Sequence, residues 1–225
     1  MDDTEGKVMV MAESLSALGA EMRALRKVRQ LTLKALSDST GLSLSHLSAV
    51  ERGTSQPSMD ALHTIAQALG VSPDWFFARR PGEGPLERAF VVRAPNRRNL
   101  NNLYGQEAGE LGYTDELLSS SIGGRFYMGI AHFAPHSDGP ERPLLSHEGE
   151  EHGLVVEGEI EMQMGEETVT LRTGDSYAFA GSIPHHTHNR TDRPAKLIWA
   201  VSPVVIPKDI VHDVARPTKT RSGGR

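Results

Sequence analysis

The spacing of apolar residues divides the chain into two parts. Up to about Phe77 these residues recur every three or four positions, which predicts short amphipathic helices. From about residue 87 the spacing changes to two, which is typical of strands with one buried face. Between the two patterns, the sequence RRPGEGP holds two prolines and two glycines, which interrupt both kinds of element. We expect a flexible N-terminus (1–13), a helical domain (14–78), a linker (79–86), a strand-rich domain (87–207) and a C-terminal tail (208–225).

Five short helices are expected in the first domain. Thr32, Ser43 and Ser58 each precede an apolar stretch, where a hydroxyl can cap a helix by accepting a backbone N–H. The first helix is expected to begin near Ser14, and Pro73 suits the first turn of a short fifth helix. Together these signals predict a compact all-α domain.

The third expected helix follows Gly41 and has the features of a helix that reads DNA. Gly41 can adopt the left-handed conformation that ends the preceding helix. Leu44, Leu47 and Val50 recur every three residues and are expected to form one apolar stripe. The remaining positions carry short polar side chains that suit a helix lying in a major groove, namely Ser43, Ser45, His46 and Ser48. A solvated helix in a helical bundle is the alternative interpretation.

Eight or nine strands are expected in the second domain. Their number and even spacing favour a small β-barrel or jelly roll, in which closure removes exposed edges. The tail from Arg216 is basic and rich in glycine, and we expect it to be disordered. The expected strands are Ala89–Ala94, Tyr113–Ser119, Arg125–Phe133, Leu154–Glu157, Glu159–Met164, Glu167–Leu171, Ser176–Phe179, His185–Asn189 and Leu197–Val201.

Composition places the chain among cytoplasmic proteins. Its 225 residues suit two domains, and the absence of cysteine excludes disulfides and thiolate metal sites. No apolar run approaches the roughly 18 residues that cross a bilayer, and the acidic start lacks the basic flank of a secretion signal, so no membrane partner is expected. The net charge is −5, yet residues 14–56 carry +3. A basic domain of such mild charge predicts modest DNA affinity per protomer and therefore a homodimer.

The stretch Leu31–Phe77 resembles the Xre/Cro-like family of helix-turn-helix repressors. The most specific parts are the ERG triplet at 51–53, Pro57-Ser58 and the ALGVS sequence at 68–72. The resemblance implies a lambda-repressor-like domain whose recognition helix begins near Ser43. Many members have a glutamine that contacts phosphate where this chain has Leu33, and we expect Lys34 to take over that contact as a less directional charge. The DNA-binding residues implied are Lys34, Ser43, Ser45, His46, Ser48 and Arg52; Arg23, Arg26 and Lys27 are candidates for a phosphate rim or, equally, for a solvated face.

Two stretches of the second domain, SHEGEEHGLVVEG and GDSYAFAGSIPHHTHN, resemble the two motifs of the cupin family. Members hold a metal through two histidines and a glutamate of the first motif and a histidine of the second. His147, Glu151 and His185 match three of these positions, and Leu145 occupies the fourth. The resemblance implies a site for zinc, iron, nickel or manganese; the alternative is a metal-free pocket in which the same residues bind an organic ligand. His186 and His188 should face away, because side chains alternate along a strand. We expect them to face solvent or an interface; the alternative is that the pair holds a surface metal.

The whole layout resembles the Xre-cupin repressors, in which the helical domain binds double-stranded operator DNA and the barrel senses a small molecule. The expected effector is a polyamine or an amino-acid-derived compound. Clustered glutamates support this idea where they face the cavity, although acidic residues on strands are usually solvated. The alternative function is a metal-dependent oxygenase or epoxidase with an assembly-type helical domain. The intact recognition segment favours a regulator, so we assign no catalytic residues. The effector-binding residues expected are His147, Glu151, His185, Tyr177 and Trp199.

Overall fold

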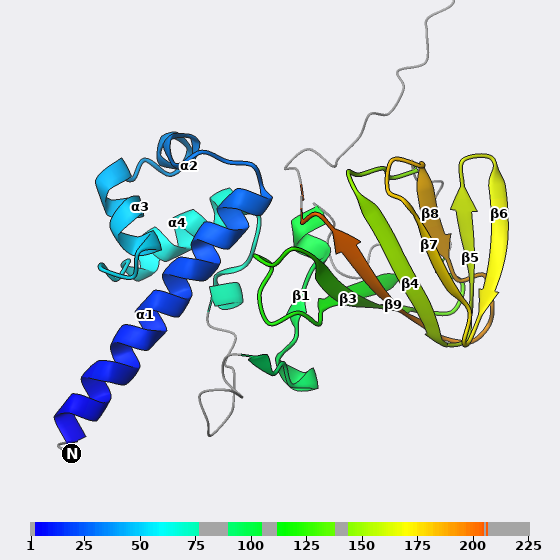
Figure 1. Ribbon diagram of the computed structural model, residues 1–225, viewed down its shortest axis with the longest axis horizontal. Coiled ribbons are helices and arrows are strands. Elements are labelled where there is room, and N and C mark those ends of the chain that lie inside the picture. Colours follow the sequence, from blue (N-terminus) through cyan, green and yellow to red (C-terminus); the bar gives the residue numbers. More distant parts are fainter. Residues whose placement is uncertain (1–2, 77–89, 105–111, 138–143, 205, 207–225) are drawn as a thin grey trace, which may run out of the picture.

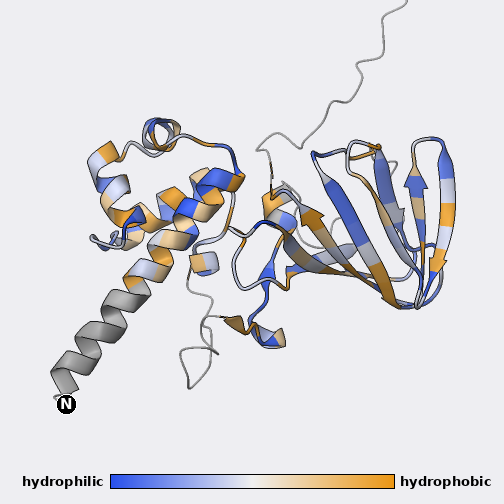
Figure 2. Ribbon diagram, viewed as in Figure 1, coloured by the Kyte–Doolittle hydropathy of each residue, from blue (hydrophilic) through white to orange (hydrophobic). Residues whose placement is uncertain are grey.

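The computed structural model describes residues 3–76, 90–104, 112–137, 144–204 and 206. A helical N-terminal domain lies beside an antiparallel β domain (Figure 1), so the expected fold class is confirmed. Hydrophobic and hydrophilic residues are mixed along the helices and strands (Figure 2), as expected for elements with one buried face. The expected linker at 79–86 and the tail at 208–225 lie outside the described residues.

Four α-helices form the N-terminal domain. The three capping predictions are confirmed, because the side chains of Thr32, Ser43 and Ser58 accept backbone N–H groups at 3.0, 3.2 and 3.1 Å. Gly41 ends its helix in the left-handed conformation, with φ of 70°. None of the described helices combines the length and hydrophobicity that crossing a bilayer requires. The helices are α1 (Asp3–Val28), α2 (Leu33–Thr40), α3 (Leu44–Glu51) and α4 (Met59–Leu69).

Two expectations for this domain are wrong. The helix α1 begins at Asp3, so the segment expected to be flexible is helical and projects beyond the other helices (Figure 1). Acidic residues near the helix start suit its dipole, and no proline interrupts the segment. The expected fifth α-helix is instead a 3₁₀ turn, η1 (Pro73–Phe76). In this turn the Trp75 N–H bonds to the Ser72 carbonyl only three residues back.

Two antiparallel sheets form the β domain, in the order β1-β2-β3-β9-β4-β7 and β6-β5-β8. Apolar side chains fill the core, among them Ile160, Met162 and Trp199. Eight of the expected strands lie within a few residues of those observed. The strands are β1 (Arg98–Asn99), β2 (Tyr113–Leu117), β3 (Tyr127–Phe133), β4 (Glu150–Glu157), β5 (Glu159–Met164), β6 (Glu167–Arg172), β7 (Ser176–Ala180), β8 (His185–His188) and β9 (Ala195–Ser202).

The strand expected at Ala89–Ala94 is not formed by the described part of that segment. Residues 91–93 have no regular structure, and a 3₁₀ turn, η2 (Ala94–Asn96), follows them. Pro95 within this turn has no N–H to give to a sheet, which explains why pairing begins only at β1. The short β1 and the 3₁₀ turn η3 (Asn101–Tyr104) were not expected from the sequence.

Helix α1 connects the two domains through a buried polar cluster. Glu21, 7% exposed, forms an ion pair with Arg98 of β1 at 2.8 Å. Its carboxylate also accepts the indole N–H of Trp75 at 3.1 Å and the hydroxyl of Ser121 at 3.0 Å. The Arg98 guanidinium in turn lies 5.2 Å from the centre of the Trp75 ring. A single carboxylate therefore links α1 to the end of the helical domain and to the β domain.

A second connection lies at the C-terminal end of α1. The Ile206 N–H donates to the Val28 carbonyl at 3.0 Å. The buried Arg29 side chain donates to the Leu69 carbonyl at 3.0 Å and to the Ile206 carbonyl at 3.4 Å. The ends of α1 and α4 are thereby tied to a segment that follows the last strand of the β domain.

Candidate DNA interface and cupin cavity

Most of the expected DNA-binding residues lie along one side of α3 or at its two caps. Ser45, Ser48 and Arg52 recur at three- and four-residue intervals, so they share a side of the helix. Arg52 is exposed and donates to the Ser48 hydroxyl. The capping hydroxyl of Ser43 lies 3.1 Å from that of Ser45. This face offers hydroxyls and one guanidinium to a groove.

The other two candidates border this face. His46 is half-buried on α3, whereas Lys34 is exposed on α2 and pairs with Asp38 at 3.1 Å. The apolar stripe expected on α3 is partly wrong, since Leu47 and Val50 are fully buried but Leu44 is 46% exposed. At about 100° per residue, Leu44 and Val50 point about 120° apart, so Leu44 lies at the edge of the buried side of the helix. An apolar side chain therefore joins the exposed end of the recognition helix.

The glutamate of the ERG triplet is a structural residue. Glu51 accepts two hydrogen bonds from the Arg26 guanidinium, at 2.6 and 2.9 Å, and the side chains are 8% and 13% exposed. Arg26 also donates to the Leu31 carbonyl at 2.8 Å. Arg26 therefore holds α1 against α3, which fits neither the phosphate rim nor the solvated face considered for it. Arg23 and Lys27 are exposed, which leaves both interpretations open for them.

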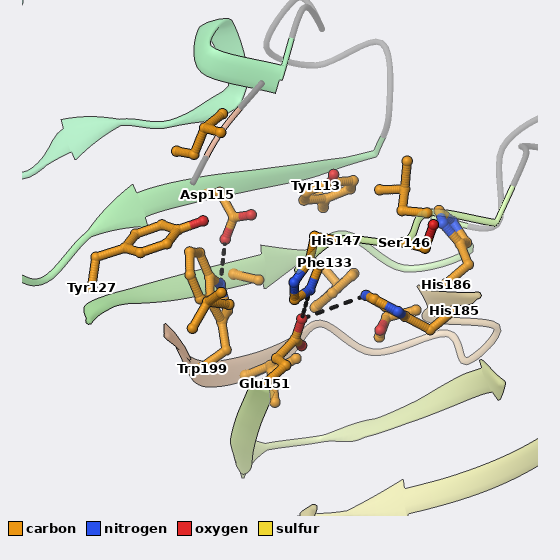
Figure 3. Close-up of a pocket in the computed structure, with 16 residues that line it drawn as sticks. Tyr113, Asp115, Tyr127, Phe133, Ser146, His147, Glu151, His185, His186 and Trp199 are labelled. Atoms are coloured by element: carbon orange, nitrogen blue, oxygen red, sulfur yellow. Dashed lines mark hydrogen bonds and ion pairs between the residues drawn. The ribbon is translucent and has the colours of Figure 1, made fainter. Parts of the chain in front are cut away.

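A cavity of about 140 Å³ opens within the β domain (Figure 3). It is close to the size of an engineered cavity of about 150 Å³ that holds benzene, so a molecule of about six non-hydrogen atoms would fill it. Its walls are mainly apolar and aromatic, with a few polar groups. The lining residues are Tyr113, Asp115, Tyr127, Ala131, Phe133, Leu145, Ser146, His147, Glu151, His185, His186, Thr187, Leu197, Trp199, Val201 and Ile206.

The structure brings three expected ligands together in what we call the His–Glu–His cluster (His147, Glu151 and His185). The Nε2 atoms of His147 and His185 lie 3.2 and 3.5 Å from the same Glu151 oxygen (Figure 3). Their Nδ1 atoms lie 2.9 and 2.8 Å from backbone carbonyls, which only accept hydrogen bonds, so each Nδ1 carries a hydrogen. Both rings are thus oriented with Nε2 toward one point.

This arrangement fits a divalent metal ion. One donor atom from each of the three residues lies within 4.8 Å of the other two. Backbone carbonyls that fix Nδ1–H are the usual supports of histidine ligands. Leu145 pairs with His185 only through backbone hydrogen bonds, at 2.9 and 2.8 Å, and gives the cavity an apolar wall where a fourth ligand would stand. Three protein ligands would leave positions open for water or an effector.

Hydrogen bonds control the charge of the cluster. Burial alone would raise the pKa of Glu151, but hydrogen bonds from His147, His185 and Tyr177 lower it to about 2. Burial disfavours the charged form of His147, but bonds to Glu151 and the Glu148 carbonyl raise its pKa overall. Glu151 is therefore ionised and already well satisfied by its neighbours.

The two expected aromatic residues have different places. One row of residues that pair across neighbouring strands lies on the same face of the sheet, namely Gly129, Trp199, Gly153 and Tyr177. A Cβ at Gly129 would come within 2.2 Å of the Trp199 ring, so only glycine leaves the ring room to lie there. Trp199 lines the cavity, whereas Tyr177 is not among its lining residues. Its hydroxyl donates to Glu151 at 2.7 Å, and burial and that carboxylate raise the Tyr177 pKa well above 10.

The sequence interpretation missed Asp115, which lines the cavity and is 7% exposed. Burial raises its pKa to about 7; a hydrogen bond from Trp199 opposes the shift, and the Glu151 charge adds to it. The sequence of β2 could have indicated this position, because Tyr113, Asp115 and Leu117 are spaced by two and therefore share one face of the strand. Among the clustered glutamates proposed to face the cavity, Glu151 lines it; Glu148, Glu150 and Glu157 are exposed, and Glu159 and Glu161 are half-buried outside its lining.

His186 also differs from expectation. It was expected to face solvent or an interface, yet it is 8% exposed and lines the cavity. Two neighbouring features contribute to its burial. Its ring lies 4.3 Å from that of His188, and the bridge between Leu145 and His185 brings the chain before β4 along this edge of β8.

Comparison with known families agrees with both domains. Residues 22–76 match the helix-turn-helix family model, and residues 129–201 match the cupin domain model. The chain therefore combines a helix-turn-helix domain with a cupin domain. It is 27% identical over 194 residues to the HTH-type transcriptional regulator PuuR of Escherichia coli K12, covering 86% of this chain and 98% of that one. The HTH-type transcriptional regulator SutR of the same organism is 25% identical over 179 residues, covering 76% and 86%.

Two solved structures are similar over most of the chain. A helix-turn-helix family transcriptional regulator from Vibrio cholerae is 22% identical with a TM-score of 0.38, covering 85% of this chain and 98% of that one. Hydroxypropylphosphonic acid epoxidase from S. wedmorenis is 20% identical with a TM-score of 0.41, covering 83% and 97%. At TM-scores below 0.5, neither likeness bears on the function of this chain.

Proposed function

We propose that this protein is a repressor that binds operator DNA through α3 and releases it when a small effector fills the cupin cavity. The observation that carries the proposal is a direct connection between cavity and reading domain. Ile206 lines the cavity, and its backbone bonds both to Val28 and to the Arg29 side chain. A displacement of Ile206 in the cavity wall would therefore shift the end of α1.

The same connection supplies a mechanism for release. Arg29 bonds at once to Ile206 and to Leu69, the last residue of α4. An effector that displaces Ile206 would move the ends of α1 and α4 relative to the β domain. Couplings between sites are typically 1–3 kcal/mol, which suffices for a switch of about 5- to 150-fold in operator affinity.

The effector is a small amine, of the polyamine or amino-acid-derived kind. A cavity near 140 Å³ favours a short compound or one end of a longer one. Its binding residues are the His–Glu–His cluster and Trp199, while Tyr177 positions Glu151. Each of these groups offers a hydrogen bond or an aromatic face rather than plain apolar wall.

The working form is a homodimer. One helical domain, whose most basic segment (14–56) carries only +3, and one short polar helix make too few contacts for a specific site. Two recognition helices must lie about 34 Å apart to enter successive major grooves. A small rotation between protomers would change that spacing and weaken binding.

A bound metal would be held by His147, Glu151 and His185. Zinc, iron, nickel or manganese suits two imidazoles and a carboxylate, and such an ion would supply a Lewis acid for a polar group of the effector. In that state Tyr177 would still fix one oxygen of Glu151, and the backbone carbonyls would still fix the two rings.

A metal-dependent oxygenase is the second candidate function, favoured by that same two-histidine, one-carboxylate set. Such an enzyme needs no reading surface, whereas α3 presents hydroxyls and Arg52 on one face. The related regulators over most of the chain also support a regulator without enzymatic activity.

The test measures operator binding by the full-length protein to DNA from upstream of its own gene. Fluorescence anisotropy is recorded with and without short amines and with and without a chelator, alongside metal analysis. R52A should lose operator affinity about tenfold or more, as one charged DNA contact does, without changing amine binding. The proposal fails if the dimer prefers its promoter no more than random duplex in every condition.

A further inference from the structure

We propose that Asp115 is the cation-binding residue of the cavity and holds an ammonium group of the effector within an aromatic enclosure. This inference rests on the proposed function, because the ligand in question is the effector. It assigns a residue and a charge to one end of the cavity, apart from the His–Glu–His cluster.

Asp115 is buried without a counter-charge among the described residues. Asp115 is 7% exposed, and Trp199 donates its indole N–H to Oδ1 at 2.8 Å. Among the residues that the structure describes, none forms an ion pair with this carboxylate. A buried carboxylate with one neutral donor is costly for the fold, and its cost is explained if a cation completes the site.

Aromatic rings surround the Asp115 carboxylate (Figure 3). Figure 3 shows Asp115 between Tyr113 and Tyr127, with Trp199 below it. Tyr127 meets the Trp199 ring edge-on at 5.1 Å, so the rings are packed against each other rather than free to turn. Faces of electron-rich rings attract cations, and a carboxylate among them defines an ammonium site.

Asp115 and Glu151 differ in how far the protein itself satisfies their carboxylates. Glu151 already accepts from Tyr177 at 2.7 Å and from His147 at 3.2 Å, so its charge is largely used within the protein. Among the described residues, the Asp115 carboxylate accepts from the Trp199 indole and forms no ion pair, and burial raises its pKa to about 7. An arriving ammonium would favour the ionised form, which makes Asp115 the more receptive of the two carboxylates.

The position of Asp115 is fixed by its backbone. Its N–H donates to Asn101 Oδ1 at 2.8 Å, and its carbonyl accepts the Leu100 N–H at 2.8 Å. The carboxylate is therefore presented to the cavity by a rigid strand, as a selective site requires.

These features define the ligand class. It is a primary amine of about six non-hydrogen atoms inside the cavity, with a second polar group that reaches the His–Glu–His cluster. Three ligands probe this directly: 1,4-diaminobutane, its isosteric alcohol 1,4-butanediol, and n-butylamine, which keeps one ammonium and lacks the second polar end.

The experiment uses isothermal titration of the full-length protein with the three ligands. The variant is D115N, whose amide oxygen can still accept the Trp199 bond, and the matched control is D192N at an exposed turn. Removing the charge should weaken diamine binding by about 10- to 100-fold, and D192N should bind like the wild type. Wild-type protein should bind both amines and not the diol. Far-ultraviolet circular dichroism checks that D115N is folded; if it is not, the wild-type comparison of diamine with diol decides alone.

Three results would overturn the inference: diamine affinity in D115N equal to wild type, diol binding as tight as diamine binding, or no binding of either amine. Operator binding is measured on the same preparations. If wild-type protein binds its promoter and responds to an amine that ignores Asp115, this inference fails alone. If it binds no promoter DNA, the proposed function fails as well.

Discussion

Two carboxylates share one cavity and meet opposite conditions. Glu151 is held by a tyrosine and two histidines, and its pKa falls to about 2. Asp115 has one indole partner, and its pKa rises to about 7. Neighbouring hydrogen bonds, rather than burial itself, decide the difference, because burial opposes ionisation of both. The cavity thus contains one carboxylate, Glu151, that is ionised through its hydrogen bonds within the protein. It also contains a second, Asp115, whose ionised form a cationic ligand would stabilise.

At this scale we expect D115N to be more stable than the wild type without ligand at pH 8. The folded-state pKa of Asp115 is about 7 against an ordinary 3.8, so the unfolded chain loses its proton first as pH rises. Wild-type stability therefore falls between about pH 4 and 7, by up to about 4 kcal/mol at 1.36 kcal/mol per pKa unit. Asparagine does not titrate and escapes this loss.

Thermal melts of both proteins at pH 5 and pH 8 check the prediction. The advantage of D115N should be larger at pH 8, and D192N should follow the wild type at both values. A D115N protein that melts below the wild type at pH 8 would show that Asp115 is not a destabilising carboxylate in the empty cavity.

At the scale of elements, the buried ion pair between Arg26 and Glu51 sets how the recognition helix sits on α1. Breaking a buried pair leaves an uncompensated charge, so E51Q should lower unfolding free energy by about 3 kcal/mol. The exposed pair of Lys34 and Asp38 is the control, since D38N should cost less than about 0.5 kcal/mol. Urea denaturation measures both, and equal effects would contradict this role for Glu51.

Leu44 gives a second prediction for α3. Because it is 46% exposed, L44A should change stability little. It should nonetheless weaken operator binding about 3- to 10-fold, since an exposed apolar side chain on a reading helix can contact a thymine methyl group. L47A is the contrast, because Leu47 is fully buried and its truncation should cost about 2–5 kcal/mol of stability. Unchanged operator affinity in L44A would place the helix end outside the groove.

Features carried by neighbouring residues could be predicted at this scale. The caps at Thr32, Ser43 and Ser58 depend on groups three residues apart. The pair of Arg26 and Glu51 spans 25 residues, so no local pattern shows it. Asp115 acquires its role only when the pairing of β2, β3 and β9 brings it beside Trp199, 84 residues away. The cupin motif was enough to predict the His–Glu–His cluster from the sequence. The other cavity residues could be identified only from the pairing register of the strands.

At the scale of the whole molecule, two groups of contacts connect the helical domain to the β domain. Glu21 lies on α1, and Arg29 directly follows the helix about two turns further along. Each side chain bonds to the β domain. R29Q should keep amine binding and reduce the effector-induced change in operator affinity toward onefold, because the bridge from Ile206 to Leu69 is lost.

The matched control is R190Q, since Arg190 pairs with Glu161 at an exposed site of the β domain. Anisotropy with and without diamine gives the ratio for each protein. An R29Q protein with the full wild-type ratio would exclude this bridge as the route between the sites.

The central claim is that one chain both reads DNA and reports on a small amine. It is tested most directly by titrating promoter DNA with the wild-type dimer in the presence and absence of 1,4-diaminobutane. The account predicts specific binding that weakens about 5- to 150-fold with the diamine. Specific binding that no short amine alters would contradict it.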